Sequence, residues 1–425
     1  MQALSTLTTV LITVLATLFL TLLVVNLATA EKRLLRRPKR LYTSSDSDFR
    51  RALGVLLGPP IIGGNDVKTL LNGDQIFPAM LDAIRSAQIS VTFETFIFRD
   101  EIGAQFCSAL TAAAQRGVRV HVLVDWLGSR GMDRSLFEPT IRAGGEVRIY
   151  HELTWYHVGR INNRTHRKLL VVDGIVGFTG GVGIGHEWTG NAQDPAHWRE
   201  THYLVRGPVV AQIQAVFVDN WIKATGEVLH GERYFPALER VGDMDAQMFA
   251  SSPAGGSESM HLMVLLAITA AQTSIDIENS YFVPDSLTID ALQSARKRGV
   301  RVRIIVPNRH TDAPLGRWAA HSLYDTLLRS GIEIFEYQPT MLHCKLMIVD
   351  ASWVSVGSGN FDNRSFRLND EANLNVFSAT LAREQTRYFE ADLAKSHRML
   401  QKRWARRRWS LRVLESIAIL LRSQL

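Results

Sequence analysis

Apolar positions along most of the chain follow two periods in turn. Runs such as 117–124 and 299–306 are rich in Val and Ile, the composition of a buried strand, whereas 105–115 and 289–297 carry apolar residues at helical spacing. Strands and helices that alternate along a chain are typical of α/β folds. The pattern therefore predicts an α/β protein.

The predicted elements occur in the same order twice. In the first half they cover 77–87, 89–98, 105–115, 117–124, 136–143 and 147–150. In the second half they cover 262–271, 274–278, 289–297, 299–306, 323–329 and 331–337. The sequence Arg-Gly-Val-Arg-Val stands at 116–120 and again at 298–302, which indicates an internal duplication. We expect two similar α/β halves, at 65–250 and 251–398, that form one pseudo-twofold site.

The two halves differ in the length of one connection. His166 lies sixteen positions after Tyr150, whereas His343 lies six positions after Tyr337. The additional residues include Trp155, Tyr156, His157 and Arg160. A loop of this kind at a site entrance can contact substrate or lipid. An inserted surface loop without such a role is an equal alternative.

The first 30 residues carry no charged side chain. The apolar stretch 4–26 is long enough to cross a bilayer, which takes roughly 20 residues, and six basic residues follow within 31–40. Basic residues beside a membrane span remain cytoplasmic. We therefore expect 1–30 to be an uncleaved single-pass anchor, with the body facing the cytoplasm. The A-x-A form of residues 28–30 leaves a cleaved signal peptide as the alternative.

Two further segments are distinguished by composition. Residues 31–64 combine the basic run with Ser, Gly and Pro residues and are predicted to be a linker. Residues 399–425 interleave Trp404 and Trp409 with basic residues, and their apolar residues fall at helical spacing. A basic amphipathic helix of this composition can lie in a membrane interface. The alternative is a helix packed on the body with a solvated basic side.

The net charge of +7 is concentrated near the two ends. Residues 31–40 and 395–412 carry six and eight basic residues, and the rest of the chain carries 34 basic and 40 acidic residues. A nucleic-acid-binding body usually presents a basic face, so we expect no nucleic-acid partner. Two cysteines, Cys107 and Cys344, are too few for a disulfide framework or a cysteine-based metal site. We expect Cys344 to pack in the core.

The candidate chemistry lies in one motif, H-x-K-x-x-x-x-D, which occurs in both halves. Its residues are His166, Lys168 and Asp173 in the first copy and His343, Lys345 and Asp350 in the second. A Gly-Gly or Gly-Ser pair follows each copy, at 180–181 and 357–358. In a strand, alternate side chains share a face, so each copy presents an imidazole beside an ammonium. Two such strands can meet over one anion.

An imidazole beside a fixed positive charge suits chemistry at phosphorus. The ammonium stabilises developing phosphate charge, one histidine can act as nucleophile, and the other can move a proton to and from an alcohol. A metal site is the competing hypothesis because His and Asp are both ligands, but the lysine would repel the cation. We therefore expect no metal, and this chemistry needs no organic cofactor. For Asp173 and Asp350, structural support of the site is favoured over proton transfer.

Over residues 71–408 the chain resembles the phospholipase D superfamily, whose signature is two such HKD motifs, and within it the bacterial cardiolipin synthases. The second part of this resemblance rests on three tracts. They are Gly185-His186-Glu187-Trp188, Gly207-Pro208-Val209 with Trp221 downstream, and Tyr281-Phe282-Val283-Pro284-Asp285. The resemblance implies a phospholipase D-like α/β fold with both motifs at one active site.

The resemblance also assigns residues outside the motifs. It implies substrate-phosphate contacts from Asn360, Ser358 and Gly181. Gly183 departs from the family pattern, because the first copy commonly has a second Asn at this place. By resemblance, Glu200 and Glu371 would hydrogen-bond the motif histidines and fix their tautomers. Without it, each would be a surface glutamate by default.

The activity implied is transfer of a phosphatidyl group between phospholipids at a bacterial inner membrane. His166 would attack the phosphodiester of phosphatidylglycerol and form a phosphohistidine, and phosphatidylethanolamine is a second candidate substrate. His343 would protonate the leaving alcohol. A second phosphatidylglycerol would then accept the group, which gives cardiolipin and glycerol. A hydrolytic phospholipase D and an HKD-type nuclease are the alternatives, and the oligomeric state stays open.

Overall fold

The computed structural model describes residues 2–27, 34, 36–152, 162–252, 258–407 and 409–420. The first repeat contains β1 (Ile62–Leu71), α3 (Asn72–Ser86), β2 (Ser90–Thr95), α4 (Asp100–Gln115), β3 (Arg119–Asp125), α5 (Glu138–Arg142), β4 (Glu146–Tyr150), β5 (Leu169–Val172), β6 (Val176–Gly180), β7 (Thr201–Arg206) and α6 (Val210–Thr225). The second contains β8 (Met244–Ser251), α7 (Ser259–Ala270), β9 (Ser274–Asn279), α8 (Ser286–Lys297), β10 (Arg301–Pro307), α9 (Pro314–Arg329), β11 (Glu333–Tyr337), β12 (Lys345–Val349), β13 (Trp353–Gly357), α10 (Asn363–Arg367), β14 (Glu371–Phe377) and α11 (Ala379–Ala394). The insertion with Trp155, Tyr156, His157 and Arg160 lies outside the described residues.

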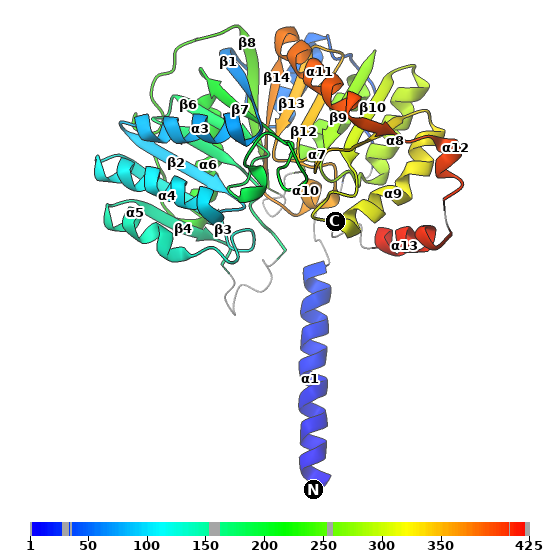
Figure 1. Cartoon of the computed structure of the whole chain (residues 1–425), viewed down its shortest axis with the longest axis horizontal. Helices are drawn as coiled ribbons and strands as arrows, with labels where there is room; N and C mark the ends of the chain where they lie inside the picture. Colours follow the sequence, from blue (N-terminus) through cyan, green and yellow to red (C-terminus); the bar gives the residue numbers. More distant parts are fainter. Residues whose placement is uncertain are drawn as a thin grey trace.

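The described strands form one mixed sheet, in the order β15-β11-β10-β9-β12-β13-β14-β8-β1-β7-β6-β5-β2-β3-β4, where β15 is Ser396–Arg398. In each repeat three neighbouring strands run parallel, and the motif strand, β5 or β12, lies antiparallel beside them. The repeats meet where β1 pairs with β8 (Figure 1). Strand order on the two sides of this pair is the same, so the repeated α/β halves are confirmed. The order also places β8 in the second repeat, ahead of the predicted boundary at residue 251.

Both faces of the sheet are buried, as the motif strand β5 illustrates. Leu170 and Val172 pack in a cluster with α3 and α4, whereas Leu169 and Val171 face a second cluster that includes α6 and α11. Burial on both faces explains why this strand is apolar at every position rather than at alternate ones. The second cluster draws residues from both repeats, and Cys344 lies in it with 0% exposure. Its predicted place in the core is confirmed.

The prediction of a linker over residues 31–64 is wrong for the second part of that range. There the chain forms α2 (Ser47–Leu56), and the side chains of Phe49 and Leu53 are fully buried in the core of the second repeat. The ring of Phe49 packs edge-on to Trp353, with centroids 6.2 Å apart. Phe49 and Leu53 are spaced for one helical face, a signal that the neighbouring Gly and Pro residues obscure.

The C-terminal segment forms two short helices, α12 (Gln401–Trp404) and α13 (Trp409–Leu420), rather than the one amphipathic helix predicted over 399–425. Trp404 is buried against Tyr324 of α9, with ring centroids 4.9 Å apart. Trp409, by contrast, is 78% exposed. The segment therefore packs on the body through one tryptophan and presents the other to its surroundings.

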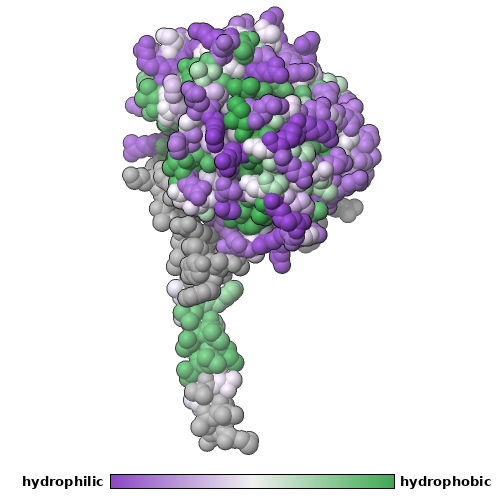
Figure 2. All heavy atoms as spheres, turned by 90° about the vertical axis from the view of Figure 1, so that its left-hand side faces the viewer, coloured by the Kyte–Doolittle hydropathy of each residue, from purple (hydrophilic) through white to green (hydrophobic). Residues whose placement is uncertain are grey.

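At the other end of the chain, α1 (Gln2–Leu27) projects from the body (Figure 1). The apolar side chains that the structure describes along α1 are exposed, for example Val10 at 54% and Phe19 at 68%, and they form the hydrophobic stretch of the stalk in Figure 2. No helix among the described residues meets the combined requirements of length and apolar character for crossing a membrane.

Candidate active site

The two motif histidines lie next to backbone contributed by the opposite repeat. The N–H of His166 donates to the carbonyl oxygen of Asp370 at 2.9 Å, and the N–H of His343 donates to that of Arg199 at 2.8 Å. The sequence predicts both histidines within strands, but β5 and β12 begin after them. The two histidines precede these strands, and their backbone N–H groups bond to the other repeat. Each partner directly precedes a glutamate.

This pairing brings each histidine to a carboxylate of the other repeat. Nδ1 of His166 lies 3.0 and 3.1 Å from the two oxygens of Glu371, and Nδ1 of His343 lies 2.5 Å from Oε2 of Glu200. Both hydrogen bonds implied by the resemblance are therefore present. A carboxylate on Nδ1 holds the proton there and leaves Nε2 without one, and Nε2 of His343 lies 3.2 Å from Nζ of Lys345.

The two motif lysines lie beside the histidines and are buried. Nζ of Lys168 donates to the carbonyl oxygen of His166 at 2.7 Å, and Nζ of Lys345 donates to that of His343 at 2.7 Å. Lys345 also donates to Oγ of Ser280 at 2.8 Å. Burial lowers the pKa of Lys168 to about 7 and also lowers the pKa of Lys345. Two ammonium groups held out of water in one site are suited to an anion.

Burial acts on the imidazoles in the same direction. It lowers the pKa of His166 to about 4, although the carboxylate of Glu371 opposes the shift. Burial, and after it the charge of Lys345, lowers the pKa of His343 well below its usual value. In the ligand-free site at neutral pH both rings are therefore neutral. A neutral imidazole has the free electron pair that a nucleophile needs.

The motif aspartates do not join this site. Asp173 and Asp350 lie at the far ends of β5 and β12, in left-handed conformations with φ of 53° and 51°. Oδ1 of Asp173 accepts the N–H of Ser90 at 2.9 Å, and Oδ1 of Asp350 accepts the N–H of Ser274 at 3.0 Å. They tie each motif strand to the start of its neighbour, the structural role that the sequence favours, and are not catalytic.

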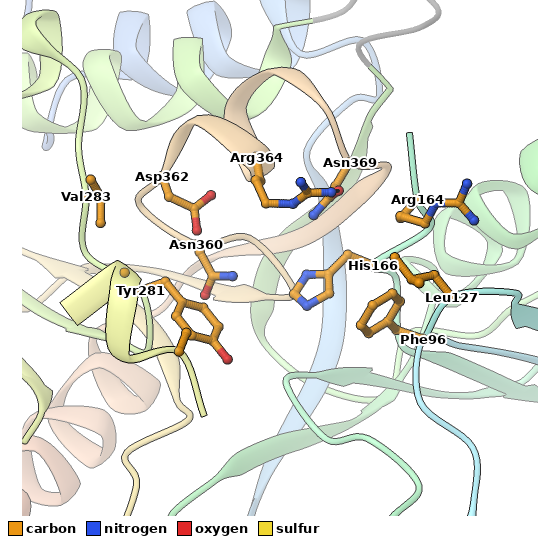
Figure 3. Close-up of a pocket in the computed structure, with 12 residues that line it drawn as sticks. Phe96, Leu127, Arg164, His166, Tyr281, Val283, Asn360, Asp362, Arg364 and Asn369 are labelled. Atoms are coloured by element: carbon orange, nitrogen blue, oxygen red, sulfur yellow. Dashed lines mark hydrogen bonds between the residues drawn. The ribbon is translucent and has the colours of Figure 1, made fainter. Parts of the chain in front are cut away.

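A cavity of about 310 Å³ opens beside His166. It is lined by Phe96, Leu127, Arg164, His166, Tyr281, Val283, Ala313, Gly316, Asn360, Asp362, Arg364 and Asn369 (Figure 3). In the view of Figure 3, Asn360 lies above the ring of Tyr281, with its amide nitrogen on the side of His166. Its predicted position at the substrate phosphate is thus compatible with the geometry.

Ser358 and Gly181, also predicted at the phosphate, lie against the glutamates instead. The hydroxyl of Ser358 donates to the carboxylate of Glu371. A Cβ on Gly181 would lie 2.6 Å from the carboxylate oxygens of Glu200, so glycine makes room for that carboxylate. Both positions support the groups that hold the histidines.

Sequence reasoning missed several polar residues of the cavity. Asp362 is 4% exposed, and burial raises the pKa of its carboxyl to about 6. Asp362 and Arg364 follow Asn360 closely, and Arg164 precedes His166, so proximity to a motif was the available signal. Within the ranges that the structure describes, no group of three or more His, Cys, Asp or Glu side chains is arranged to hold a metal ion.

Comparison with known proteins adds an independent observation. Residues 80–221 and 264–393 match the family described as "Cardiolipin synthase, PLD-like domain". Cardiolipin synthase A of Pseudomonas fluorescens (strain SBW25) is 37% identical over 354 residues, which are 83% of this chain and 73% of that protein. Cardiolipin synthase of Staphylococcus aureus (strain Mu50 / ATCC 700699) is 33% identical over 361 residues, 84% of this chain and 73% of that protein.

Two solved structures share the fold at low sequence identity. Phosphatidylserine synthase of Haemophilus influenzae Rd KW20 aligns over 89% of this chain and 100% of that one, with a TM-score of 0.69 and 13% identity. Polyphosphate kinase of Porphyromonas gingivalis aligns over 80% of this chain and 49% of that one, with a TM-score of 0.54 and 14% identity. The fold, the paired motifs and the extent of the sequence matches agree, and the chain belongs to the cardiolipin synthase family of phospholipase D-like proteins.

Proposed function

We propose that the protein is a phosphatidyltransferase that makes cardiolipin and glycerol from two molecules of phosphatidylglycerol. The observation that carries this proposal is the crossed pairing of the site, in which each buried histidine is held by a glutamate of the opposite repeat, with two buried lysines beside them. Such a site offers one nucleophile, one acid–base group and positive charge at a single phosphate. The names of the relatives supply the lipid substrate class.

In the first step, Nε2 of His166 attacks the phosphorus of the donor lipid. The bond from phosphorus to the glycerol oxygen breaks, and glycerol leaves with a proton from His343. Lys168 and Lys345 stabilise the charge that develops on the phosphate oxygens. The product of this step is a phosphatidyl group bonded to His166. An anionic phosphate between these residues favours the protonated form of His343 that the step needs.

In the second step, the terminal hydroxyl of another phosphatidylglycerol gives its proton to His343. Its oxygen bonds to phosphorus as the phosphorus–nitrogen bond breaks, which releases cardiolipin and restores neutral His166. If water takes the place of this hydroxyl, the product is phosphatidic acid. Water exclusion from the closed site therefore decides between transfer and hydrolysis.

We also propose that α1 attaches the protein to a bacterial inner membrane, with the body on the cytoplasmic side. Exposed apolar side chains along α1 and the exposed Trp409 of α13 support this. Residues 36–40, four of which are basic, can contact anionic headgroups. Deletion of residues 2–27 is expected to release the protein from the membrane pellet on ultracentrifugation, and retention in the pellet would contradict anchoring by α1.

The full chain in phosphatidylglycerol vesicles tests the activity directly. We expect cardiolipin and glycerol in equal amounts from the wild type, neither from His166→Ala or His343→Ala, and wild-type yields from a control in the exposed His230, His230→Ala. Phosphatidic acid alone would make the protein a hydrolytic phospholipase D. The absence of any product would refute the proposal for this donor.

A second substrate separates the roles of the two histidines. A phosphatidyl ester of 4-nitrophenol needs no proton on its leaving group, so the first step no longer depends on His343. We expect His343→Ala to accumulate a phosphatidyl adduct on the peptide that contains His166, detected by mass spectrometry. An adduct on His343 in the His166→Ala variant would reverse the assignment.

A further inference from the structure

The two repeats can be compared position by position after the motif aspartates. Residues 180–188 correspond to 357–365, because both stretches begin seven residues after the motif aspartate. The fifth residue of each stretch also makes an isolated parallel β-bridge, Ile184 with Phe98 and Phe361 with Phe282. Two pairs of positions differ in a way that concerns the site. Gly183 corresponds to Asn360, and Trp188 corresponds to Ser365.

Trp188 occupies the space of the asparagine that the first repeat lacks. A Cβ at Gly183 would lie 2.8 Å from a ring atom of Trp188, closer than side chains approach one another. Trp188 is 1% exposed, and its ring lies edge-on to His343 with centroids 5.3 Å apart. In the second repeat the smaller Ser365 leaves room for Asn360, which lines the cavity. The first repeat therefore has an indole where the second has an amide.

The indole N–H also replaces the hydroxyl of Ser365. Oγ of Ser365 donates to Oε1 of Glu371 at 2.7 Å. Nε1 of Trp188 lies 3.3 Å from Oε2 of Glu200 and 3.3 Å from Nδ1 of His343. In both repeats, therefore, the same position donates to the carboxylate that holds a histidine.

We propose that Trp188 is the positioning residue of the Glu200–His343 pair, which it holds through its indole N–H. Its ring fills the space of an asparagine at position 183, so Asn360 alone of the two equivalent positions contacts the substrate phosphate. The role rests on the proposed phosphatidyl transfer, in which His343 moves the proton. A donor to a buried carboxylate favours the ionised form, and an ionised Glu200 keeps the proton of His343 on Nδ1. Burial already raises the pKa of Glu200, so loss of this donor raises that pKa further.

Trp188→Phe tests the indole N–H, because it keeps an aromatic ring and removes the donor. We expect the acidic limb of the kcat profile to move to higher pH by about one unit, the size for one hydrogen bond to a charged group, with an unchanged KM for phosphatidylglycerol. The matched control is Trp353→Phe, since Trp353 is fully buried and its Nε1 has no hydrogen-bond partner among the described residues. A Trp188→Phe profile that coincides with the control profile overturns the proposal.

Placing the Asn and Ser of the second repeat at positions 183 and 188 tests whether the Trp188 ring takes the place of an asparagine. Gly183→Asn alone sets its side chain against Trp188 and is expected to lower kcat at least tenfold. Trp188→Ser alone leaves a void beside Glu200. The double variant Gly183→Asn/Trp188→Ser reproduces the arrangement of Asn360 and Ser365, and we expect it to be more active than Gly183→Asn. A double variant no better than Gly183→Asn would show that Trp188 does not take the place of the asparagine.

A readout without lipid separates this inference from the proposed function. Diethyl pyrocarbonate modifies neutral histidine, and its rate at His343 can be followed by peptide mass spectrometry. We expect the pH dependence of that rate to change in Trp188→Phe and not in Trp353→Phe, and an unchanged dependence in both overturns the positioning role. A change in Trp188→Phe together with no cardiolipin from the wild type would refute the proposed reaction and support the role of Trp188.

Discussion

The surroundings of His166 and His343 differ although the scaffold is duplicated. Glu371, beside His166, accepts hydrogen bonds from the hydroxyls of Ser358 and Ser365. Glu200, beside His343, accepts the backbone N–H of Thr201 at 2.9 Å and lies 3.3 Å from the indole nitrogen of Trp188. One carboxylate is thus held by two hydroxyl groups and the other by a backbone amide and an indole.

This difference is reflected in the acidity of the two carboxyl groups. Burial acts to raise the pKa of Glu371, but His166, Lys168 and Ser358 hold it below its ordinary value. Burial prevails at Glu200 and raises its pKa. The carboxylate of Glu371 is therefore the more firmly ionised of the two, which suits an imidazole that must keep its proton on Nδ1 and present a free electron pair on Nε2. Two equivalent positions can therefore take different roles in one reaction.

The largest expected effect comes from Glu371→Gln compared with Glu200→Gln. A glutamine amide donates to Nδ1 and moves the imidazole proton to Nε2, which blocks His166 as a nucleophile. We expect kcat to fall roughly 10⁴-fold in Glu371→Gln, the loss seen when a catalytic imidazole is held in the wrong tautomer. In Glu200→Gln we expect a loss of roughly 10²-fold, the lower range of acid–base catalysis. Equal losses from pH 5 to 9 in the vesicle assay would contradict the division of roles.

The sequence predicts what is local to each repeat and not what crosses between them. The duplication and both HKD motifs are contiguous patterns, and they specify the fold and four of the residues that meet at the site. Glu371 lies 205 residues from His166 and Glu200 lies 143 residues from His343, so no local spacing connects them. They were predicted from family resemblance alone.

Other features were missed for a related reason. Gly183 is visible in the sequence as a departure, but the indole that fills its space comes from a 3₁₀ turn at Trp188 whose path depends on packing. The sequence does not predict α2, because the neighbouring Gly and Pro residues indicate turns and the core into which Phe49 packs is formed by distant residues. Contacts made in three dimensions decided both cases.

An intermediate effect distinguishes the two lysines. Lys168 packs near the ring of Phe96, with Nζ 5.6 Å from its centroid, and burial lowers its pKa to about 7, whereas Lys345 has Ser280 as an additional acceptor. Lys168 is charged below pH 7 and loses its charge as the pH rises through that value. We expect kcat/KM to fall above about pH 7, by roughly tenfold per unit.

Lys168→Arg sharpens this assignment, because arginine stays charged throughout the range. We expect this variant to have a lower maximum and a kcat/KM that no longer falls between pH 7 and 9. Lys345→Arg serves as the matched control and is expected to retain the alkaline limb. An alkaline limb that persists in Lys168→Arg and disappears in Lys345→Arg would assign the fall in kcat/KM to Lys345 instead of Lys168.

The smallest expected effect concerns stability rather than chemistry. Asp350 accepts the N–H and the hydroxyl of Thr273 at 2.7 and 2.8 Å and also the hydroxyl of Ser44, whereas Asp173 accepts backbone N–H groups such as that of Ile89 at 2.7 Å. Asp350→Asn is therefore expected to destabilise the protein by about 1–3 kcal/mol, and Asp173→Asn by less. Both changes should lower the Tm of the full chain in detergent and leave the ratio of cardiolipin to phosphatidic acid unchanged.

The pH dependence of that Tm difference carries a definite sign. Burial acts to raise the pKa of Asp350, but hydrogen bonds from Ser44, Ser274 and Thr273 hold it below its ordinary value. A carboxyl whose pKa is lowered by folding stabilises the protein above the pKa of the unfolded chain and loses that contribution as pH falls through the folded value. The gap in Tm between wild type and Asp350→Asn should therefore be full at neutral pH and narrow below roughly pH 4. A gap that widens in acid would contradict the lowered pKa of Asp350. An altered product ratio would place Asp350 in the chemistry and remove the distinction between the two ends of the motif strand.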